Sequence, residues 1–368
     1  MSTFVIVALL VWAGMNGYAF WRLGTILALM RVPIWATGIT GVAAWLSFPV
    51  ARSVRHNWPR MGGFLEVVSV NWLGILLLLC VCYMVVDAAT LGGLLWRNGA
   101  LKLRFGATIV AGILSGVAFV QGARDPVVRQ EEIVLPGLPK MRDGLRVLFV
   151  SDMHLGRQIG REWLQRMVVQ ADALKPDLIA IAGDLVDHDV ELVQPLVPEL
   201  SRLQAPLGVW VVLGNHDIYG GALESTNLMR AAGFKVLLNE SAEAAPGLRI
   251  AGVEDLGFHM RSGSAENDVR KALGGGRSGQ EGVLYLSHTP ALLDLAAESG
   301  AGLMLCGHTH GGQIWPFNYL VASRFPTIAG RYTVKGMTLF VSRGAGTWGP
   351  RMRLWKSGEI YLITLRAP

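Results

Sequence analysis

The sequence has few cysteines and few charged residues. Its three cysteines, Cys80, Cys82 and Cys306, are too few for a disulfide framework or a four-cysteine zinc site. Only 16% of the 368 residues are charged, whereas about 25% is usual in soluble proteins. Hydrophobic residues make up 52% of the chain, and the mean hydropathy is +0.40. A wholly soluble enzyme, a disordered chain and a fibrous repeat are therefore excluded.

Acidic residues are almost absent from the N-terminal third. Residues 1–122 hold eight of the 33 basic residues but only two of the 27 acidic ones, Glu66 and Asp87. Residues 123–368 are electrically balanced, so the net charge of +6 belongs to the N-terminal third. The C-terminal part has no excess of basic residues that could bind the phosphates of a nucleic acid. We therefore expect no nucleic-acid partner.

Four apolar stretches in this third approach or reach the roughly 18–20 residues that span a bilayer. They are Phe4–Phe20, Val32–Val50, Val67–Val86 and Phe105–Gly122. The first stretch lacks a basic leader and a small-residue cleavage site, so a cleaved signal peptide is not predicted. We predict that residues 1–122 form a transmembrane anchor of about four helices, with the lipid bilayer as partner.

An even number of spans places the residues after the anchor on the same side of the membrane as Met1. Basic residues are divided equally between the two sets of loops, so the positive-inside rule gives no orientation. The single acidic candidate in a span, Asp87, lies at the edge of its stretch, and we interpret it as a carboxylate solvated at the interface. A transporter would need charged residues deep in the spans, so the pattern favours an anchor.

From Leu145 onward the pattern changes to short apolar runs that end in Gly, Asp, Asn or His. Continuous apolarity over four to six residues is typical of strands buried on both faces. The runs are Leu145–Val150, Leu178–Ala182, Val209–Leu213, Leu248–Val253, Val283–Leu286 and Leu303–Cys306. Helix-like segments at Glu162–Leu174 and Val190–Leu203 separate the first three and imply βαβ crossovers.

The closing stretches, Arg331–Ser342 and Glu359–Leu365, alternate more and predict antiparallel strands. Residues 123–143 are predicted as a linker and an edge strand. Residues 144–368 are then predicted to form one α/β domain.

Metal-type ligands follow five of the predicted strand ends. The clusters are Asp152-Met153-His154, Gly183-Asp184-Leu185-Val186-Asp187, Gly214-Asn215-His216-Asp217, Ser287-His288 and Gly307-His308-Thr309-His310. Ligand sites of α/β sheets lie beyond the carboxyl ends of strands, so we expect these clusters to converge. Carboxylate oxygen with imidazole nitrogen suits Zn, Mn or Fe rather than Ca or Mg alone. Two such ions about 3.5–4 Å apart clamp the attacking and leaving oxygens of a displacement at phosphorus.

Two local features support convergence. On an extended segment, residues two apart such as Asp152 and His154 point to the same side. The glycines that precede Asp184, Asn215 and His308 are expected to let the backbone turn tightly.

The series D-x-H, G-D-x-x-D, G-N-H-D, H and G-H-x-H resembles the calcineurin-like metallophosphoesterase superfamily, over roughly residues 144–366. The resemblance implies an α/β metallophosphatase domain, an αββα sandwich of two mixed β-sheets flanked by helices. Cys306–Ile314 and Ser342–Leu354 are similar to one subgroup, which includes exported bacterial phosphodiesterases and transmembrane proteins with a metallophosphoesterase domain. Four spans ahead of the domain fit the latter.

The resemblance also implies roles for individual residues. The first metal ion would be held by Asp152, His154, Asp184 and His310. The second would be held by Asp184, Asn215, His288 and His308, with Asp184 bridging. A hydroxide shared by the two ions would be the nucleophile, and His216, oriented by Asp187, would be the general acid. Protein Ser/Thr phosphatases carry an arginine where this chain has His188, which argues against a phosphoprotein substrate and leaves the phosphate clamp unidentified.

The sequence thus predicts a membrane-anchored binuclear-metal phosphoesterase, a metal-dependent phosphoric ester hydrolase with two divalent ions. One alternative is a pyrophosphatase or phosphodiesterase of a lipid-linked substrate such as a lipid A precursor. Another is a non-catalytic metal-binding sensor, which would have no use for His216 and Asp187. Family analogy places the protein in an inner membrane as a multi-pass protein, with the catalytic domain on the extracytoplasmic face.

Overall fold

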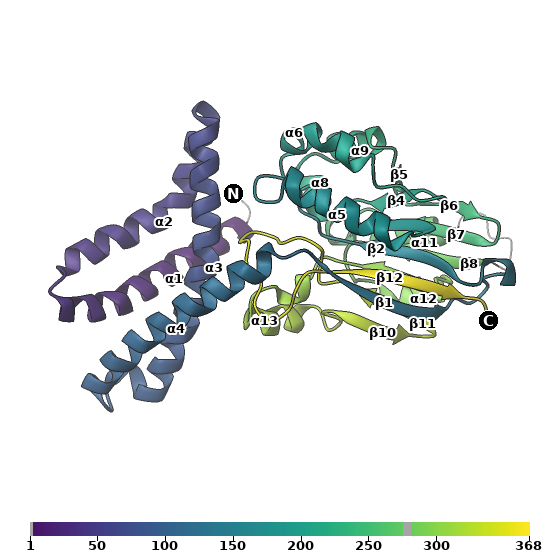
Figure 1. Cartoon of the computed structure of the whole chain (residues 1–368). Coiled ribbons are helices and arrows are strands. Elements are labelled where there is room, and N and C mark those ends of the chain that lie inside the picture. Colours follow the sequence, from purple (N-terminus) through teal and green to yellow (C-terminus); the bar gives the residue numbers. More distant parts are fainter. Residues whose placement is uncertain (1–2, 275–280) are drawn as a thin grey trace. The chain divides into compact units, whose positions relative to one another are not determined.

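The computed structural model describes residues 3–274 and 281–368, which form two compact units (Figure 1). The helical unit holds the chain up to Ala123 together with Gly349–Leu354. The α/β unit holds Arg124–Trp348 and Trp355–Pro368.

Residues 349–354 pack with the helices, although we expected the whole of 144–368 to be one domain. The Arg351 N–H donates to Asn71 Oδ1 at 2.9 Å, and the Arg353 N–H donates to the Ala118 carbonyl at 2.9 Å. Sequence patterns do not report such backbone contacts between segments that lie more than 200 residues apart.

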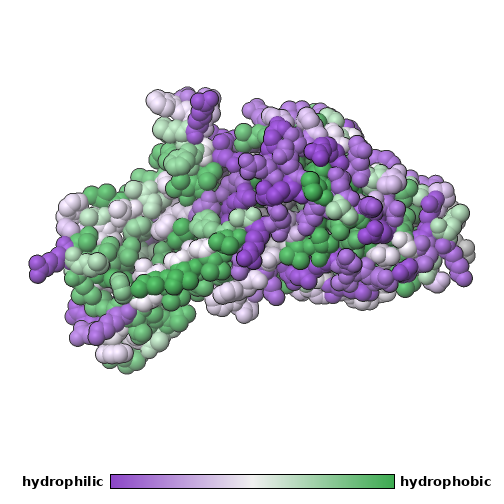
Figure 2. All heavy atoms as spheres, in the orientation of Figure 1, coloured by the Kyte–Doolittle hydropathy of each residue, from purple (hydrophilic) through white to green (hydrophobic). Residues whose placement is uncertain are grey.

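The helical unit contains four long helices joined by short turns. They are α1 (Thr3–Leu27), α2 (Ile34–Asn57), α3 (Pro59–Thr90) and α4 (Arg97–Ala123), with 3-10 turns η1 (Ala28–Met30) and η2 (Leu91–Gly93). All four are long and apolar enough to cross a membrane. Large apolar side chains cover their outer surface (Figure 2), which is typical of lipid-facing helices. The four predicted apolar helices are therefore confirmed.

Asp87 is not the solvated carboxylate that we expected. Its side chain is only 14% exposed and lies 2.7 Å from both Arg22 Nε and Arg104 Nη2. Asp87 lies on α3, whereas the arginines come from α1 and α4. The position of Asp87 at the edge of an apolar stretch could not reveal partners from two other helices.

The α/β unit is built on two six-stranded sheets. The first has the order β1-β12-β2-β3-β4-β5 and the second β10-β11-β9-β8-β7-β6. The strands of the first sheet are β1 (Val127–Val134), β2 (Leu145–Val150), β3 (Leu178–Ala182), β4 (Val209–Val212), β5 (Lys235–Val236) and β12 (Glu359–Arg366). Those of the second are β6 (Glu240–Ala245), β7 (Leu248–Gly252), β8 (Gly282–Leu286), β9 (Leu303–Cys306), β10 (Gly330–Val334) and β11 (Met337–Val341).

Both sheets mix parallel and antiparallel pairs. β2, β3, β4 and β5 run parallel, while β12 pairs antiparallel with β2 and parallel with the edge strand β1. In the second sheet β7, β8, β9 and β11 run parallel, and β6 and β10 pair antiparallel at the two edges. The predicted apolar runs therefore correspond to central strands. The predicted antiparallel pairing of the closing stretches holds in part: β10 pairs antiparallel with β11 and β12 with β2, but β11 and β12 also pair parallel with β9 and β1.

The helices cover the outer faces of the two sheets. On the first sheet they are α5 (Arg161–Leu174), α6 (Val190–Val193), α7 (Val197–Leu200) and α9 (Ala222–Ala231), and on the second α10 (Leu256–Ser262), α11 (Ala265–Gly274) and α12 (Leu293–Glu298). Two further helices, α8 (Asn215–Tyr219) and α13 (Phe317–Arg324), follow loops at the ends of strands. The predicted helix over 190–203 is broken into α6, a 3-10 turn η4 (Gln194–Leu196) and α7. Pro195 and Pro198 cause the breaks, because proline lacks an N–H and clashes with the preceding helical turn.

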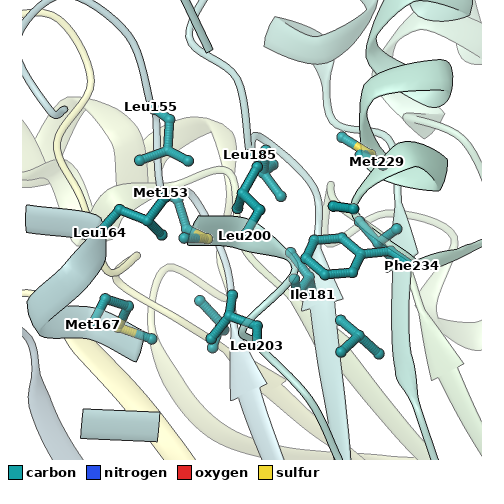
Figure 3. Close-up of a cluster of buried hydrophobic side chains, with 14 of the residues drawn as sticks. Met153, Leu155, Leu164, Met167, Ile181, Leu185, Leu200, Leu203, Met229 and Phe234 are labelled. Carbon is teal, nitrogen blue, oxygen red and sulfur yellow. The ribbon is translucent and has the colours of Figure 1, made fainter. Parts of the chain in front are cut away.

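Alternating side chains of each strand enter different hydrophobic layers. Phe149, Trp210, Phe340 and Tyr361 point between the sheets, where the rings of Phe149 and Tyr361 stack at 5.9 Å. The other face of the first sheet packs on helices through a cluster that includes Ile181 (Figure 3). A third cluster joins the second sheet to α10, α11 and α12. Because side chains alternate across a strand, this gives the four layers of the expected αββα sandwich.

Candidate metal centre

The seven predicted metal ligands lie in loops at the carboxyl ends of five strands. Three of these strands belong to the first sheet and two to the second, and the ligands follow β2, β3, β4, β8 and β9. Backbone hydrogen bonds continue past the ends of β2 and β3, since the His154 N–H donates to the Asp184 carbonyl at 3.0 Å. The loops are thereby held in the register of the sheet.

One group of ligands joins the loops after β2 and β9. His154 Nε2 lies 3.0 Å from His310 Nε2, and His310 Nε2 lies 3.4 Å from Asp152 Oδ1. All three side chains are buried. Among the described residues, Asp152 Oδ2 is a buried oxygen without a hydrogen-bond partner. Three lone-pair atoms that converge, beside a buried carboxylate oxygen without a partner, cannot satisfy one another by hydrogen bonds alone. A cation bound between them would satisfy all of them.

A second group joins the loops after β4, β8 and β9. His308 Nδ1 lies 2.9 Å from Asn215 Oδ1 and 3.2 Å from His288 Nε2, and the distance from His288 Nε2 to Asn215 Oδ1 is 3.2 Å. The His288 Nδ1–H donates to the Ala182 carbonyl at 2.9 Å, so Nε2 of the neutral ring carries the lone pair. This arrangement is the one that a metal-binding imidazole needs.

Asp184 lies between the two groups. The same oxygen, Oδ2, is 3.6 Å from His154 Nε2 in the first group and 3.2 Å from His288 Nε2 in the second. The other oxygen, Oδ1, accepts the His216 backbone N–H at 2.8 Å, which fixes the rotation of the carboxylate. One oxygen is therefore available to both groups.

The buried carboxylate of this centre needs a positive charge beside it. Burial alone would raise the pKa of Asp184, but the charge and hydrogen bond of His288 hold the pKa well below its ordinary value. Burial likewise opposes the imidazolium of His288, yet Asp184 raises its pKa well above the usual range. Burial and the neighbouring His288 lower the pKa of His308. A buried carboxylate surrounded by imidazoles thus needs a cation, which a divalent metal ion can supply in place of a proton.

Five ligands adopt a left-handed backbone. The residues with positive φ are Asp152 (53°), His154 (48°), Asp184 (51°), His308 (73°) and His310 (50°). Non-glycine residues in this region cost of order 1–3 kcal/mol each and persist only where the surroundings impose them. Asp152 and His154 do converge as expected, but they do so on left-handed rather than extended backbone.

The glycines that precede the ligands act mainly by lacking a side chain. A Cβ at Gly214 would lie 2.1 Å from Asp184 Oδ1, and one at Gly307 would lie 2.2 Å from Asp152 Oδ2. Neither glycine has positive φ, unlike Gly183 at 78°. The expected tight turn therefore holds at Gly183, whereas the other two glycines give the carboxylates room.

His216 and Asp187 lie beside the first group. His216 Nδ1 is 3.1 Å from Asp187 Oδ1, and the same oxygen is 3.4 Å from His154 Nδ1. The His154 and His216 rings meet edge to face at 4.7 Å. Although burial opposes the charged ring, the hydrogen bond and charge of Asp187 raise the pKa of His216. His188 is half-exposed, with Nδ1 3.2 Å from Asp187 Oδ1.

Asp217 and His259 lie outside the seven predicted ligands. Asp217 accepts the backbone N–H groups of Val186 and Gly214 and so fixes two of the ligand loops. Burial and the nearby charge of Asp184 raise the pKa of Asp217 to about 7. His259 lies on helix α10, and its Nδ1 is 2.8 Å from Asp268 Oδ2.

Sequence reasoning missed two aromatic residues beside His216. The rings of Tyr219 and Trp348 lie 6.0 and 6.1 Å from the His216 ring. Gln313 holds Trp348 through two hydrogen bonds, because its Nε2 donates to the Trp348 carbonyl and its Oε1 accepts the Trp348 N–H, both at 2.9 Å. The segment around Trp348 carried a subgroup resemblance, which was the available signal.

Several known proteins are similar in sequence to this chain. A model of the calcineurin-like phosphoesterase family matches residues 145–312. A Danio rerio transmembrane protein with metallophosphoesterase domain is 32% identical over 325 residues, covering 82% of this chain and 74% of that protein. A Bos taurus protein of the same name is 32% identical over 275 residues, covering 71% and 62%. An uncharacterized metallophosphoesterase of Aquifex aeolicus is 34% identical over 236 residues, covering 62% and 87%.

Proposed function

We propose that this chain, which belongs to the calcineurin-like phosphoesterase family, is a membrane-anchored hydrolase that cleaves phosphate esters with two divalent metal ions. One observation carries the proposal: Asp184 Oδ2 lies within 3.6 Å of donor atoms from both ligand groups. A carboxylate oxygen that faces two separate sets of ligand atoms is what a pair of ions needs.

The first ion would be held by Asp152, His154, Asp184 and His310, and the second by Asp184, Asn215, His288 and His308. Mixed carboxylate, amide and imidazole donors favour Mn, Zn or Fe. Bound ions would supply Lewis-acid charge at the phosphoryl oxygens and lower the pKa of water so that it can attack phosphorus at neutral pH.

His216 donates a proton to the leaving oxygen of the ester. Support comes from its place beside the first ligand group and from Asp187, whose Oδ1 is 3.1 Å from Nδ1 and holds the ring. A carboxylate partner orients an imidazole and stabilises its charged form. Asp187 also faces Nδ1 of His154 at 3.4 Å, so it positions a metal ligand as well as the acid.

A lipid-linked phosphodiester or pyrophosphate is a second candidate substrate, and one surface favours it. Helix α13 follows the metal-binding loop, and the residues just after the helix contact that loop. Thr309 Oγ1 donates to the Ile328 carbonyl at 2.6 Å, and the Phe325 ring lies 5.2 Å from the His308 ring. Exposed apolar and aromatic side chains gather in and before this helix, namely Trp315, Phe317, Tyr319 and Leu320. Such a surface suits an acyl or polyprenyl chain attached to the phosphate.

The proposed metal dependence is tested with the purified full-length chain on p-nitrophenyl phosphate and bis-p-nitrophenyl phosphate. Manganese, zinc, iron and magnesium are added singly after the chain has been stripped with a chelator. We expect hydrolysis to disappear on stripping and to return best with manganese, zinc or iron. Asp294→Asn, a change in an exposed carboxylate, serves as control and should hydrolyse normally. Absence of hydrolysis of every phosphate ester by the fully metal-loaded chain would exclude the enzyme and leave a metal-binding sensor.

The α/β unit is proposed to lie on the same side of an inner membrane as Met1, on the extracytoplasmic face. Four helices return the chain to its starting side, and family analogy supplies the face. Reporters fused after Gly122 and at Pro368, with a tag at Met1, should all give extracytoplasmic signals. Cytoplasmic signals at all three positions would reverse the orientation. Opposite signals at Met1 and Gly122 would show an odd number of spans.

A further inference from the structure

A charged cluster lies inside the helical unit, apart from the metal centre. Asp87 on α3 contacts Arg22 on α1 and Arg104 on α4, and the Tyr18 hydroxyl donates to Asp87 Oδ2 at 2.6 Å. The side chains of Arg22, Arg104 and Asp87 are only 10%, 5% and 14% exposed. Ionisable groups buried among membrane-spanning helices are costly and are seldom without a function.

The two arginines are bound differently. Arg104 donates to Asp87 Oδ1 from Nε at 3.0 Å and from Nη2 at 2.7 Å, and Nη2 also reaches the Gly92 carbonyl at 2.8 Å. Arg22 Nε lies 2.7 Å from Asp87 Oδ2 but is not aligned for a hydrogen bond. Within the described part of the chain, this buried nitrogen has no hydrogen-bond partner. Arg22 is therefore held to Asp87 by an ion pair, whereas Arg104 is held by aligned hydrogen bonds.

The cluster carries one positive charge more than it can balance. Two guanidinium groups face one carboxylate, and a tyrosine hydroxyl is neutral. Glu66, the other acid among residues 1–122, pairs with Arg55 and lies 21 residues before Asp87 on α3, about 30 Å away along the helix. The helix dipoles do not offset this charge. The C-terminal ends of α1 and α3 bring partial negative charge to this face of the unit, and the N-terminal ends of α2 and α4 bring as much partial positive charge.

The cluster lies at the depth of lipid headgroups if the helices span a bilayer. Arg22 is five residues from the end of α1, Asp87 three from the end of α3, and Arg104 seven from the start of α4, which corresponds to about 5–10 Å. The Arg22 guanidinium stacks on Trp21 at 3.7 Å, and the Trp21 side chain is exposed. Tryptophan favours the membrane–water interface.

The turn beside Arg22 consists of two glycines in succession. Gly92 and Gly93 have φ of 70° and 97°, and a Cβ at Gly92 would lie 3.7 Å from Arg22 Nη2. The chain therefore passes the guanidinium without placing a side chain there. Guanidinium groups bind phosphate oxygens with paired, charge-assisted hydrogen bonds.

We propose that Arg22, with the Gly92–Gly93 turn beside it and Arg104 behind it, binds the phosphate of an anionic phospholipid in the leaflet that meets η1 and η2. The lipid supplies the negative charge that the cluster lacks and links α1, α3 and α4 to that leaflet. The phosphate group is the recognised chemistry, so a free phosphate ion would satisfy the same donors. This site is independent of the proposed hydrolase activity.

The test uses the full-length chain in a neutral detergent. Retained lipid is measured by native mass spectrometry, and the melting temperature is followed during titration with phosphatidylglycerol, phosphatidylcholine or inorganic phosphate. We expect phosphatidylglycerol to be retained and to raise the melting temperature more than phosphatidylcholine does. Arg22→Gln should weaken phosphatidylglycerol binding about 10–100-fold, as expected for the loss of hydrogen bonds between charged groups. Arg22→Lys should keep most of the preference, because the charge remains.

Arg97→Gln is the matched control, since it removes an exposed arginine near the same face and should leave the preference unchanged. Protection by inorganic phosphate that Arg22→Gln abolishes would support the same site with a free ion as its ligand. Equal destabilisation of Arg22→Gln in both lipids, with the preference intact, would assign Arg22 to helix packing and overturn the proposal. If Arg22→Gln does not accumulate, the wild-type titrations decide, because equal effects of the two lipids overturn the proposal.

Discussion

Asp184→Asn is expected to lose both metal ions. The substitution keeps the size of the side chain but removes the charge from the oxygen that faces both ligand groups, at 3.6 Å from His154 Nε2 and 3.2 Å from His288 Nε2. Loss of an outer hydrogen-bond partner alone typically costs 10–100-fold in metal affinity, so loss of a shared carboxylate should cost more for each ion. Metal content after dialysis, measured by inorganic mass spectrometry, should fall from two ions per chain to below one.

His154→Ala is the informative comparison, because His154 belongs to one group only. It should lower the occupancy of one ion and leave the other bound by Asn215, His288 and His308. Asp294→Asn controls for the loss of a carboxylate elsewhere. Two fully occupied ions in Asp184→Asn would contradict the bridging role, and equal loss of both ions in His154→Ala would contradict the division into two groups.

His216→Ala is expected to keep both ions and to lose turnover according to the leaving group. General acid catalysis contributes roughly 10²–10⁴-fold, so alkyl phosphate esters should be hydrolysed more slowly by that factor. p-Nitrophenolate leaves without a proton, and the loss on p-nitrophenyl esters should be much smaller. Steady-state rates on both series, together with the metal content of the same samples, measure this difference.

Asp187→Asn should show the same pattern more mildly, because Asp187 holds the His216 ring but transfers no proton to the ester. Its metal content must be measured as well, since Asp187 Oδ1 also faces Nδ1 of the ligand His154. His259→Ala, whose ring contacts Asp268 and Ser264, is the control for the loss of a histidine. Equal losses of His216→Ala on alkyl and p-nitrophenyl esters would rule out the general acid, and missing metal would make His216 a ligand.

The strands and the order of the motifs were predictable because they depend on local patterns. Three of the predicted strands, at 145–150, 178–182 and 303–306, have the bounds found in the structure. Their continuous apolarity reflects burial on both faces, which is a property of each strand alone. The break of the 190–203 helix has a local cause as well, because Pro195 and Pro198 lie within that segment.

The geometry of the ligands was not predictable from spacing. Asp152 and His154 reach the centre through left-handed backbone, which they adopt because the surrounding loops hold them there. Trp348 reaches His216 through hydrogen bonds to Gln313, 35 residues earlier. The ion pairs of Asp87 are not predictable from its position at the edge of an apolar stretch, because its two arginine partners lie on other helices.

The sequence by itself determined the apolar N-terminal helices, the α/β strands and the kinds of donor atom that follow them, because each depends on composition and short-range periodicity. Only the tertiary structure decided that Asp184 Oδ2 faces both ligand groups, that residues 349–354 pack with the helices, and that Arg22 and Arg104 share the carboxylate of Asp87. Each of these depends on a few ångströms between atoms far apart in the chain. Such distances are set by how the packed elements meet, and no local pattern of residues encodes them.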